Sequence, residues 1–302
     1  MNIKVTKRSG KVVELNLEKW QAQVAKVCEG VSDVSQSMIE ITSQPHFFDG
    51  ITTREIDGLT LRAIVDLIDE EQQPETGHTN YQFVAGKQRL SMLRKDVYGQ
   101  YQPPHLYQIV KTNVKSGLYT PELLEWYSED EWNKMDKIIN HEKDENASYA
   151  AIEQMIGKYL VRNRSTGQIY ETPQMLYMMI ALTLFETSGK DEEGKVNWER
   201  MKWVKEFYDA ISQFYISLPT PIMAGVRTPT RQFSSCVLIE SGDSLDSINA
   251  TATSIVKYIS KKAGIGIGAG SIRALGSRIG DGSVVHTGLI PFLKYFQSAV
   301  KS

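Results

Sequence analysis

The sequence predicts a mixed α+β chain, with a small hairpin-and-helix domain first, a helical domain next and the start of an α/β domain last. The first observation is a hairpin pattern in residues 3–15, where a basic, glycine-containing turn separates two short apolar runs. The second is helical spacing of apolar residues across most of residues 105–216. The third is a strand, turn and helix pattern that starts at Cys236.

Length and composition are typical of a globular protein. The 302 residues suffice for at least two domains of ordinary size, and 41% of them are hydrophobic and 23% charged. A net charge of −2 gives no sign of a nucleic-acid partner. The N-terminus lacks a signal-peptide core, and no apolar run approaches the roughly 20 residues that a membrane span needs. Two cysteines far apart in sequence form no disulfide framework, so we expect a reducing, cytoplasmic location.

The N-terminal segment predicts a hairpin followed by helices. Residues 3–5 and 12–15 are the expected strands, and Asn16 caps the helix that follows them. Apolar residues recur at helical spacing again in residues 51–67 and 83–93. We expect these helices to close over the hairpin.

The turn of the hairpin is cationic, with Lys7 and Arg8 at its tip and Lys19 in the first turns of the next helix. From the turn alone, a solvated hairpin tip is the simpler interpretation. The alternative is that the three cations gather around a phosphate group.

Loop signals mark the end of this first segment. Residues 70–78 contain proline and glycine and predict a surface loop, in which His78 is exposed to solvent rather than bound to a ligand. Residues 98–104 contain one glycine and two prolines, which stop the preceding helix and predict a domain boundary.

Within the helical middle, three local patterns stand out. Residues 159–170 predict a short hairpin with its turn at residues 165–167, and residues 186–197 predict a charged loop. The methionines of residues 175–180 recur at helical spacing, so we interpret them as core residues and not as a cofactor site.

Cys236 stands where a strand begins. Two proline-containing turns precede it, and the apolar run at residues 237–239 has the length and β-branching of a buried strand. Gly242 then breaks the strand, and either Asp243 or Ser244 caps the next helix. An isolated cysteine of this kind is more commonly a small buried hydrophobe than a reactive thiol.

Glycine recurs at alternate positions in residues 264–270. Gly264, Gly266 and Ala269 satisfy a loose dinucleotide-binding fingerprint, but a helix rather than a strand precedes them, which excludes that site. The pattern predicts a strand with one face stripped of side chains, where a ligand or another backbone comes close. A final helix over residues 291–302 has an apolar face that we expect to lack cover in this chain.

Four motifs in the last third of the chain carry a family resemblance: LPTPIMAGVRTPTRQFSSCVLIE, GDSLDSI, KKAGIGIGAG and IRALGS. They resemble the start of the catalytic barrel in the large subunit of class I ribonucleotide reductase. This implies a ten-stranded α/β barrel that is incomplete here, with unpaired edges on its first strands. It also implies that Cys236 is one of two cysteines that reduce the substrate ribose and form a disulfide, and that Thr220 and Ser235 hold the substrate.

The same resemblance implies a site for the deoxynucleotide effectors that select the substrate. That site lies in a loop at the dimer interface of the family. Carried across by motif position, its residues are Asp243, Ser244, Leu245, Arg273, Arg278 and Ile279.

Residues 1–100 resemble the ATP-cone, the domain that reads the ratio of ATP to dATP in these reductases. The residues that would hold the nucleotide with Mg²⁺ are Lys7, Arg8, Asn16, Lys19, Thr53 and Lys95. Two positions depart from the family pattern, because Asp57 stands where many members carry histidine and Val13 where glutamate is frequent. An anion at Asp57 opposes a bound triphosphate, so the resemblance implies the domain without extending to inhibition by dATP.

The resemblance therefore implies three domains: the ATP-cone at residues 1–100, a helical domain at 101–220, and the beginning of the barrel with its effector loop at 221–302. The implied reaction converts ribonucleoside diphosphates to deoxyribonucleoside diphosphates by thiol and radical chemistry. We expect this chain to be the N-terminal part of the subunit, either truncated or one piece of a split enzyme, and to be inactive alone.

The implied partners are the C-terminal part of the large subunit, a second large subunit, a small subunit that carries the radical cofactor, and thioredoxin or glutaredoxin as reductant. No metal is expected on the residues of this chain. The alternative is a regulatory nucleotide-binding protein without chemistry of its own. A glycyl-radical class III reductase fits poorly, because TPTRQFSSC and GDSLDSI follow the class I pattern.

Overall fold

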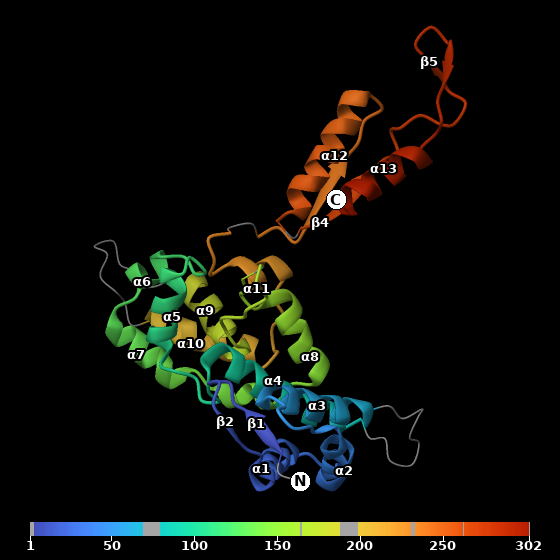
Figure 1. The fold of residues 1–302 in the computed structure, drawn as a ribbon. Coiled ribbons are helices and arrows are strands. Elements are labelled where there is room, and N and C mark those ends of the chain that lie inside the picture. Colours follow the sequence, from blue (N-terminus) through green and yellow to red (C-terminus); the bar gives the residue numbers. More distant parts are fainter. Residues whose placement is uncertain are drawn as a thin grey trace. The chain divides into compact units, whose positions relative to one another are not determined.

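The computed structural model describes residues 3–68, 79–163, 165–187, 199–230, 233–261 and 263–301. The chain divides into two compact units, Met1–Ser217 and Leu218–Ser302, which are drawn from blue to red along the sequence in Figure 1. The loop predicted at residues 70–78, with His78, lies outside the described residues. So does most of the loop predicted at residues 186–197.

The first unit begins with the predicted hairpin. Strands β1 (Lys4–Thr6) and β2 (Val12–Glu14) pair antiparallel, with Val5 opposite Val13. The tip closes through a hydrogen bond from the Lys7 N–H to the carbonyl of Lys11 at 2.9 Å, and Gly10 supplies the positive φ of 80° that this turn requires. The predicted hairpin is therefore confirmed.

Four helices and a short 3₁₀ turn pack with the hairpin. They are α1 (Leu17–Cys28), α2 (Gln36–Ser43), η1 (Gln44–His46), α3 (Thr53–Asp66) and α4 (Tyr81–Tyr98). Asn16 caps α1 as predicted, since its side chain accepts a hydrogen bond from the Lys19 N–H at 2.7 Å. Helix α4 ends at Gly99, whose φ of 71° stops the helix within the predicted boundary. The fully buried residues of this core are Val24, Ile39, Ile51, Ile64, Val84 and Ala85.

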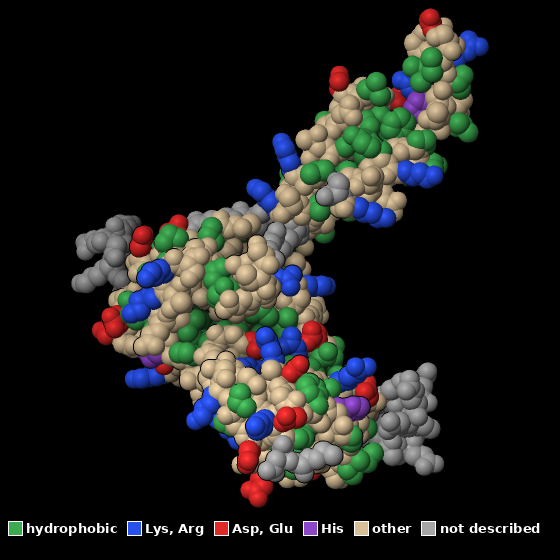
Figure 2. Space-filling view, viewed as in Figure 1, with side chains coloured by type: hydrophobic (Ala, Val, Ile, Leu, Met, Phe, Trp, Pro, Cys, Tyr) green, Lys and Arg blue, Asp and Glu red, His purple; other side chains and the backbone are tan. Residues whose placement is uncertain are grey.

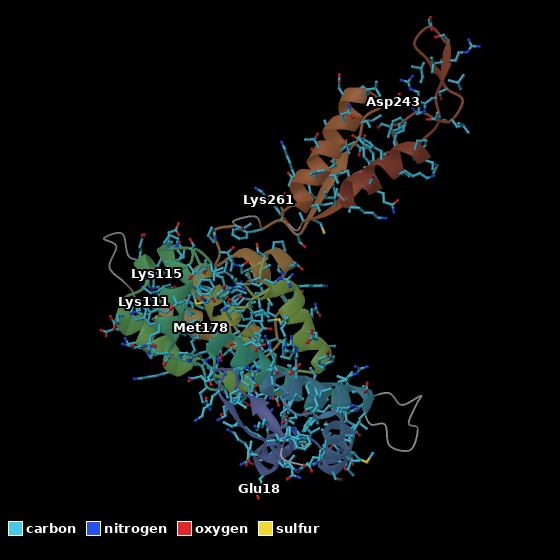
Figure 3. All side chains as sticks on the ribbon, in the orientation of Figure 1. Glu18, Lys111, Lys115, Met178, Asp243 and Lys261 are labelled. Atoms are coloured by element: carbon cyan, nitrogen blue, oxygen red, sulfur yellow. The ribbon has the colours of Figure 1, made fainter. Side chains whose placement is uncertain are left out.

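The rest of the first unit is helical, as predicted. Its elements are α5 (Leu106–Lys115), α6 (Glu122–Trp126), α7 (Glu129–Ile138), η2 (His141–Asn146), α8 (Tyr149–Gln154), η3 (Met155–Tyr159), α9 (Pro173–Leu184) and α10 (Glu199–Ser212). The methionines of α9 are core residues, and Figure 3 marks Met178 inside this group of helices. A β-bridge between Arg162 and Ile169 confirms the short hairpin at residues 159–170.

The N-terminal helices and the later helices of this unit pack directly on one another. Helix α4 contacts both η2 and α8. At Gly86 of α4 a side chain would collide with the backbone carbonyl of Ala147, so the absence of a Cβ permits this close approach.

The second unit contains a strand, helix, strand unit. After α11 (Thr220–Gly225), strand β3 (Cys236–Glu240) leads through α12 (Leu245–Ile259) into strand β4 (Gly264–Gly268), and β3 and β4 pair in parallel. Of the two capping candidates, Ser244 is the one that caps α12, accepting a hydrogen bond from the Ser247 N–H at 3.1 Å. The chain then forms a small hairpin of β5 (Arg278–Ile279) and β6 (Val284–Val285) and ends in α13 (Ile290–Lys301).

One face of the β3–β4 pair is buried and the other is open. Ile239, Ile265 and Ile267 pack on a core from α12 and α13 that includes Ile255 and Phe296. On the opposite face Leu238 is 87% exposed, so the prediction of a buried strand is wrong for that face. Among the described residues no third strand pairs with β3 or β4.

The prediction that the last helix lacks cover is also wrong in part. Phe296 is only 1% exposed, and Phe292 and Ala299 pack with it against the α12 core. Tyr295 of the same helix remains 44% exposed. Figure 2 shows further hydrophobic side chains on the surface of the second unit. No helix of the described chain is both long and apolar enough to cross a bilayer.

Candidate functional site

The open face of the β3–β4 pair carries Cys236 at its edge. In the parallel register Cys236, Leu238 and Glu240 lie opposite three glycines of β4, Gly264, Gly266 and Gly268. A Cβ built on Gly264 would lie 3.3 Å from the Cys236 sulfur, which is tighter than an ordinary contact. Gly264 therefore leaves the space beside the thiol free of a side chain, as the sequence pattern predicts, whereas the side chains of Leu238 and Glu240 lie over Gly266 and Gly268.

The two cysteines differ in accessibility. Cys236 is exposed, whereas Cys28 in α1 is half-buried, and both are free thiols. Burial raises the pKa of Cys28 to about 11, so that its thiolate, the reactive form, is scarce near neutral pH. Of the two, Cys236 is the more accessible thiol.

The two residues expected to hold substrate lie near Cys236 in sequence. Ser235 is exposed, and its carbonyl accepts a hydrogen bond from the Gly264 N–H at 2.8 Å. Thr220 is half-buried at the start of α11. Within the described residues no hydrogen bond joins Thr220 to Ser235 or Cys236.

Two of the expected effector residues, Asp243 and Arg273, meet just before the N-terminal end of α12, where Figure 3 marks Asp243. Asp243 accepts hydrogen bonds from the backbone N–H of Arg273 at 2.9 Å and from its Nε at 2.5 Å. These bonds, the backbone one first, hold the pKa of Asp243 below its usual value. Arg273 also donates to the carbonyl of Arg278 at 3.2 Å. Leu245 and Ile279 are exposed and open to a ligand, at 74% and 37%.

Sequence reasoning missed the β5–β6 hairpin and the role of His286. The Asp281-Gly282 dipeptide is a hairpin signal that could have found the turn, and Gly282 has a φ of 89°. His286 is buried, accepts the Gly288 N–H on Nδ1 at 3.0 Å, and stacks on Phe292 with ring centroids 5.4 Å apart. It thereby ties the base of the hairpin to α13.

In the first unit, two of the expected nucleotide residues, Arg8 and Lys95, form ion pairs with the same carboxylate, that of Asp57. Arg8 Nη1 lies 3.1 Å from Oδ2, and Lys95 Nζ lies 3.1 Å from each carboxylate oxygen. Gln23, which sequence reasoning missed, donates to Oδ1 at 2.9 Å. No local pattern marks Gln23, because it meets Asp57 only in the folded chain.

The other expected nucleotide residues do not join this cluster. Lys7, Asn16 and Lys19 are exposed, and Thr53 is half-buried in the first turn of α3. Within the described residues Lys7 and Lys19 form no ion pair, so their charges are open to a ligand.

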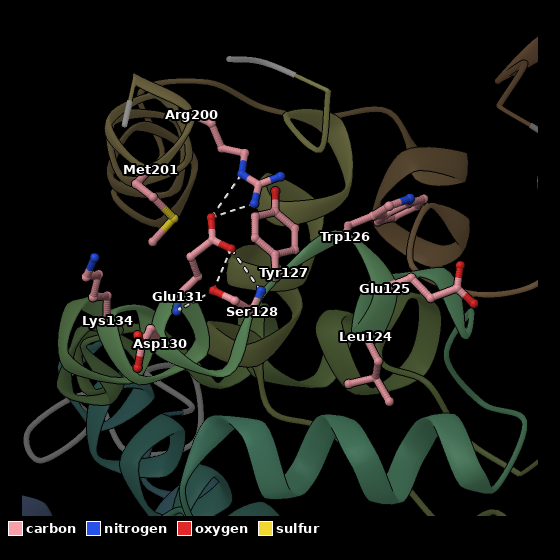
Figure 4. A pocket seen from close by; sticks show the side chains of 10 residues that line it. All are labelled: Leu124, Glu125, Trp126, Tyr127, Ser128, Asp130, Glu131, Lys134, Arg200 and Met201. Carbon is pink, nitrogen blue, oxygen red and sulfur yellow. Dashed lines mark hydrogen bonds and ion pairs between the residues drawn. The ribbon is translucent and has the colours of Figure 1, made fainter. Parts of the chain in front are cut away.

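A pocket of about 560 Å³ opens beside a buried ion pair in the first unit (Figure 4). Arg200 is fully buried and donates to Glu131 Oε1 from Nε at 3.1 Å and from Nη2 at 2.5 Å. Burial alone would raise the pKa of Glu131, but hydrogen bonds from Arg200 and Ser128 outweigh it and hold that pKa below its usual value. Arg200 also stacks over Tyr127 at 4.3 Å. The charges here pair with each other, which indicates a structural role.

A metal site is not apparent in the part of the chain that the structure describes. No group of three or more His, Cys, Asp or Glu side chains in it could hold a metal ion.

Comparison with known proteins shows which family models the sequence matches. Residues 145–231 match the family model "Ribonucleotide reductase, all-alpha domain", and residues 234–302 match "Ribonucleotide reductase, barrel domain". The barrel match therefore begins just before Cys236 and contains both β3, which starts with Cys236, and β4.

Relatives of the chain are large subunits. It is 51% identical over 301 residues to ribonucleoside-diphosphate reductase 1 subunit alpha of Escherichia coli (strain K12) and 50% identical over 301 residues to subunit alpha of Haemophilus influenzae. It is 45% identical over 300 residues to subunit alpha of Enterobacteria phage T4. These alignments cover 99% or 100% of this chain and 38% of each relative. The chain thus spans well under half the length of these relatives, and it belongs to the ribonucleotide reductase large-subunit family.

Proposed function

We propose that the chain is part of an enzyme that reduces ribonucleoside diphosphates to deoxyribonucleoside diphosphates, and that Cys236 is one of its two reducing thiols. The observation that carries this proposal is the exposed Cys236 on a sheet face that Gly264 keeps clear, within the segment that matches the barrel model. A substrate ribose needs such room to approach a thiol.

The chemistry balances with a pair of thiols. The substrate loses its 2′-hydroxyl as water and gains a hydrogen at that carbon, while two thiols lose two hydrogens and form one disulfide. The disulfide must then be reduced by thiol exchange before the next turnover, for which thioredoxin or glutaredoxin is the proposed reductant. The second thiol of this pair is proposed to lie in the remaining part of the large subunit.

Both a substrate site and an effector site are proposed on residues of this chain. Thr220 and Ser235 bind the substrate, and the loop of Asp243, Ser244, Leu245, Arg273, Arg278 and Ile279 binds the deoxynucleotide effector. The bond of Asp243 to Arg273 supports this, since it fixes the loop before a ligand arrives. An anchored loop loses less conformational entropy on binding.

The first hundred residues are proposed to be an ATP-cone that binds ATP or dATP with Mg²⁺. Support comes from the cations Lys7, Arg8, Lys19 and Lys95, which lie on the hairpin tip, α1 and α4 of one packed domain. Residues 101–220 would then form the helical domain and residues 221–302 the beginning of the barrel. The first unit of the structure ends close by, at Ser217.

Partners follow from the same proposal. The open edges of β3 and β4 would pair with further barrel strands supplied by the remaining part of the large subunit. The proposed assembly is a dimer of large subunits with a small subunit that generates the radical. We place it in the cytoplasm, where thiols are kept reduced.

A reconstitution experiment tests the proposed function. The chain is mixed with the remaining part of the large subunit, the small subunit and a dithiol, and deoxynucleotide formation is measured for Cys236→Ser and for Cys28→Ser as the matched control. Cys236→Ser should lose multiple turnover, and Cys28→Ser should keep it. Multiple turnover by the Cys236→Ser assembly would contradict the proposal.

A further inference from the structure

Asp57 is a buried carboxylate that accepts hydrogen bonds from three side chains, two of them cationic. Its exposure is only 5%, yet Arg8, Gln23 and Lys95 all donate to its two oxygens. The backbone carbonyl of Asp57 accepts a further hydrogen bond from Gln88 at 3.0 Å. A buried carboxylate without such partners would be strongly destabilising, so these contacts are required by the position of Asp57.

The partners of Asp57 come from separate elements. Arg8 lies at the tip of the β1–β2 hairpin, Asp57 on α3 and Lys95 on α4. A second carboxylate, Asp96, extends the cluster, with Arg8 at 3.5 Å and Arg54 at 2.9 Å. The guanidinium of Arg8 is therefore shared between two carboxylates of the protein itself.

A polyphosphate at Arg8 and Lys95 would need the same nitrogen atoms that now point at Asp57. Phosphate oxygens and carboxylate oxygens compete for such donors, because both are anionic acceptors. If both anions stayed, they would repel each other at short range in a partly buried site, where screening by water is weak. Binding must therefore either displace Asp57 from its cations or accept this repulsion.

We propose that Asp57 is an internal counter-anion that occupies Arg8 and Lys95 when nucleotide is absent and thereby lowers the affinity of this domain for polyphosphates. The inference rests on the proposed nucleotide site and adds its regulation. The geometry also implies that binding loosens the link from the hairpin tip to α3, since Arg8 makes that link through Asp57. Asp57 thus sets the nucleotide concentration at which the site fills.

Calorimetric titration of the full chain with MgATP, with MgdATP and with magnesium triphosphate tests the proposal. Asp57→Asn removes the charge and keeps the shape, and we expect about tenfold tighter binding, as for the loss of a close, partly buried like charge. Asp57→Glu keeps the charge and should stay close to the unmodified chain. Asp66→Asn makes the same change at an exposed position of α3 outside the cluster and should have no effect.

The outcomes separate this inference from the proposed function. If neither the unmodified chain nor Asp57→Asn binds any of the three ligands at millimolar concentration, the proposed nucleotide site is wrong. If folded Asp57→Asn binds with the affinity of the unmodified chain, or more weakly, the counter-anion is wrong. Far-UV circular dichroism checks the fold of each variant.

A measurement on the unmodified chain keeps the test decisive should Asp57→Asn fail to fold. Carbon-13 NMR follows the carboxyl resonance of Asp57 as magnesium triphosphate is added. The resonance should move as Arg8 and Lys95 turn to the ligand, while that of Asp66 stays in place. Saturable binding without movement of the Asp57 resonance would overturn the inference.

Discussion

Asp243, before α12, and Arg273, after β4, are joined by two hydrogen bonds, one from the Arg273 backbone N–H at 2.9 Å and one from its Nε at 2.5 Å. The pair closes the loop between β4 and the β5–β6 hairpin onto the start of the helix. Because one bond is made by the backbone, Asp243 fixes the path of the chain as well as the side chain of Arg273.

Removing the charge of Asp243 should loosen this loop. We expect Asp243→Asn to raise the hydrogen-exchange rate of the Arg273 amide severalfold, because charge-assisted hydrogen bonds are the stronger kind. Asp246→Asn, in the first turn of α12, is the matched control and should leave that rate unchanged. In the unmodified chain the same loosening should appear only as pH falls below 3.8, since the depressed pKa keeps the carboxylate charged above it. Equal exchange in both variants would show that Asp243 does not hold the loop.

Breaking the ion pair of Glu131 and Arg200 should destabilise the first unit. Arg200→Met leaves Glu131 without its cation in a mostly buried site, and we expect a loss of about 3 kcal/mol in the free energy of unfolding. Urea denaturation measures it. The double variant Glu131→Gln with Arg200→Met should recover part of the loss, because no unpaired charge remains.

The control for that loss lies on the same helix. Lys205 and Asp209 form a mostly exposed pair at 2.7 Å, and Lys205→Met should cost less than about 1 kcal/mol. Similar losses for Lys205→Met and Arg200→Met would contradict the distinction between the buried and exposed pairs.

Asp144 and His141 predict opposing effects of pH on stability. Burial raises the pKa of Asp144 to about 7, although Gln174 and Arg94 partly offset this. The folded chain then holds a proton that the unfolded chain releases above pH 3.8, so this group's contribution to stability falls as pH rises from 3.8 to about 7. Burial lowers the pKa of His141 to about 4, so its contribution is lost as pH falls from 6.5 to about 4.

Two substitutions separate these effects. Asp144→Asn should abolish the loss of stability that Asp144 causes as pH rises from 3.8 to about 7. The free energy of unfolding of this variant, relative to that of the unmodified chain, should therefore rise by up to about 1.4 kcal/mol per pH unit in that range. His141→Gln should change the slope in the opposite direction between pH 4 and 6.5. Denaturation curves collected across this range check both. Parallel curves for all three proteins would show that neither group titrates on unfolding.

Local signals in the sequence predicted most elements. The cap at Asn16, the glycine stop at Gly99 and the apolar spacing of α9 each depend on residues only a few positions apart. They can therefore be recognised in the sequence alone. The alternating glycines of β4 likewise predicted a bare strand face, and the register places Gly264 beside Cys236. These features need no knowledge of the rest of the fold.

Contacts between distant segments were not predictable in this way. The burial of Phe296 depends on α12, and the hydrogen bonds of Asp57 depend on the hairpin tip, α1, α3 and α4 meeting. Periodicity reports that a helix has an apolar face, but not which other element covers it. A charge seen in the sequence likewise does not reveal whether it faces water or a partner of opposite sign.

The bare face beside Cys236 predicts how its thiol reacts. In Gly264→Ala the new Cβ would lie 3.3 Å from the sulfur and 3.5 Å from the carbonyl of Ser235, so the thiol must shift or lose open space. We expect its alkylation by iodoacetamide to slow by about threefold, because thiol reactivity follows access as well as ionisation. Gly270→Ala is the control, since a Cβ there meets nothing within 4 Å and should leave the rate unchanged. Peptide mapping separates Cys236 from the slower Cys28. If Gly264→Ala reacts at the same rate as the unmodified chain, Gly264 does not govern access to Cys236.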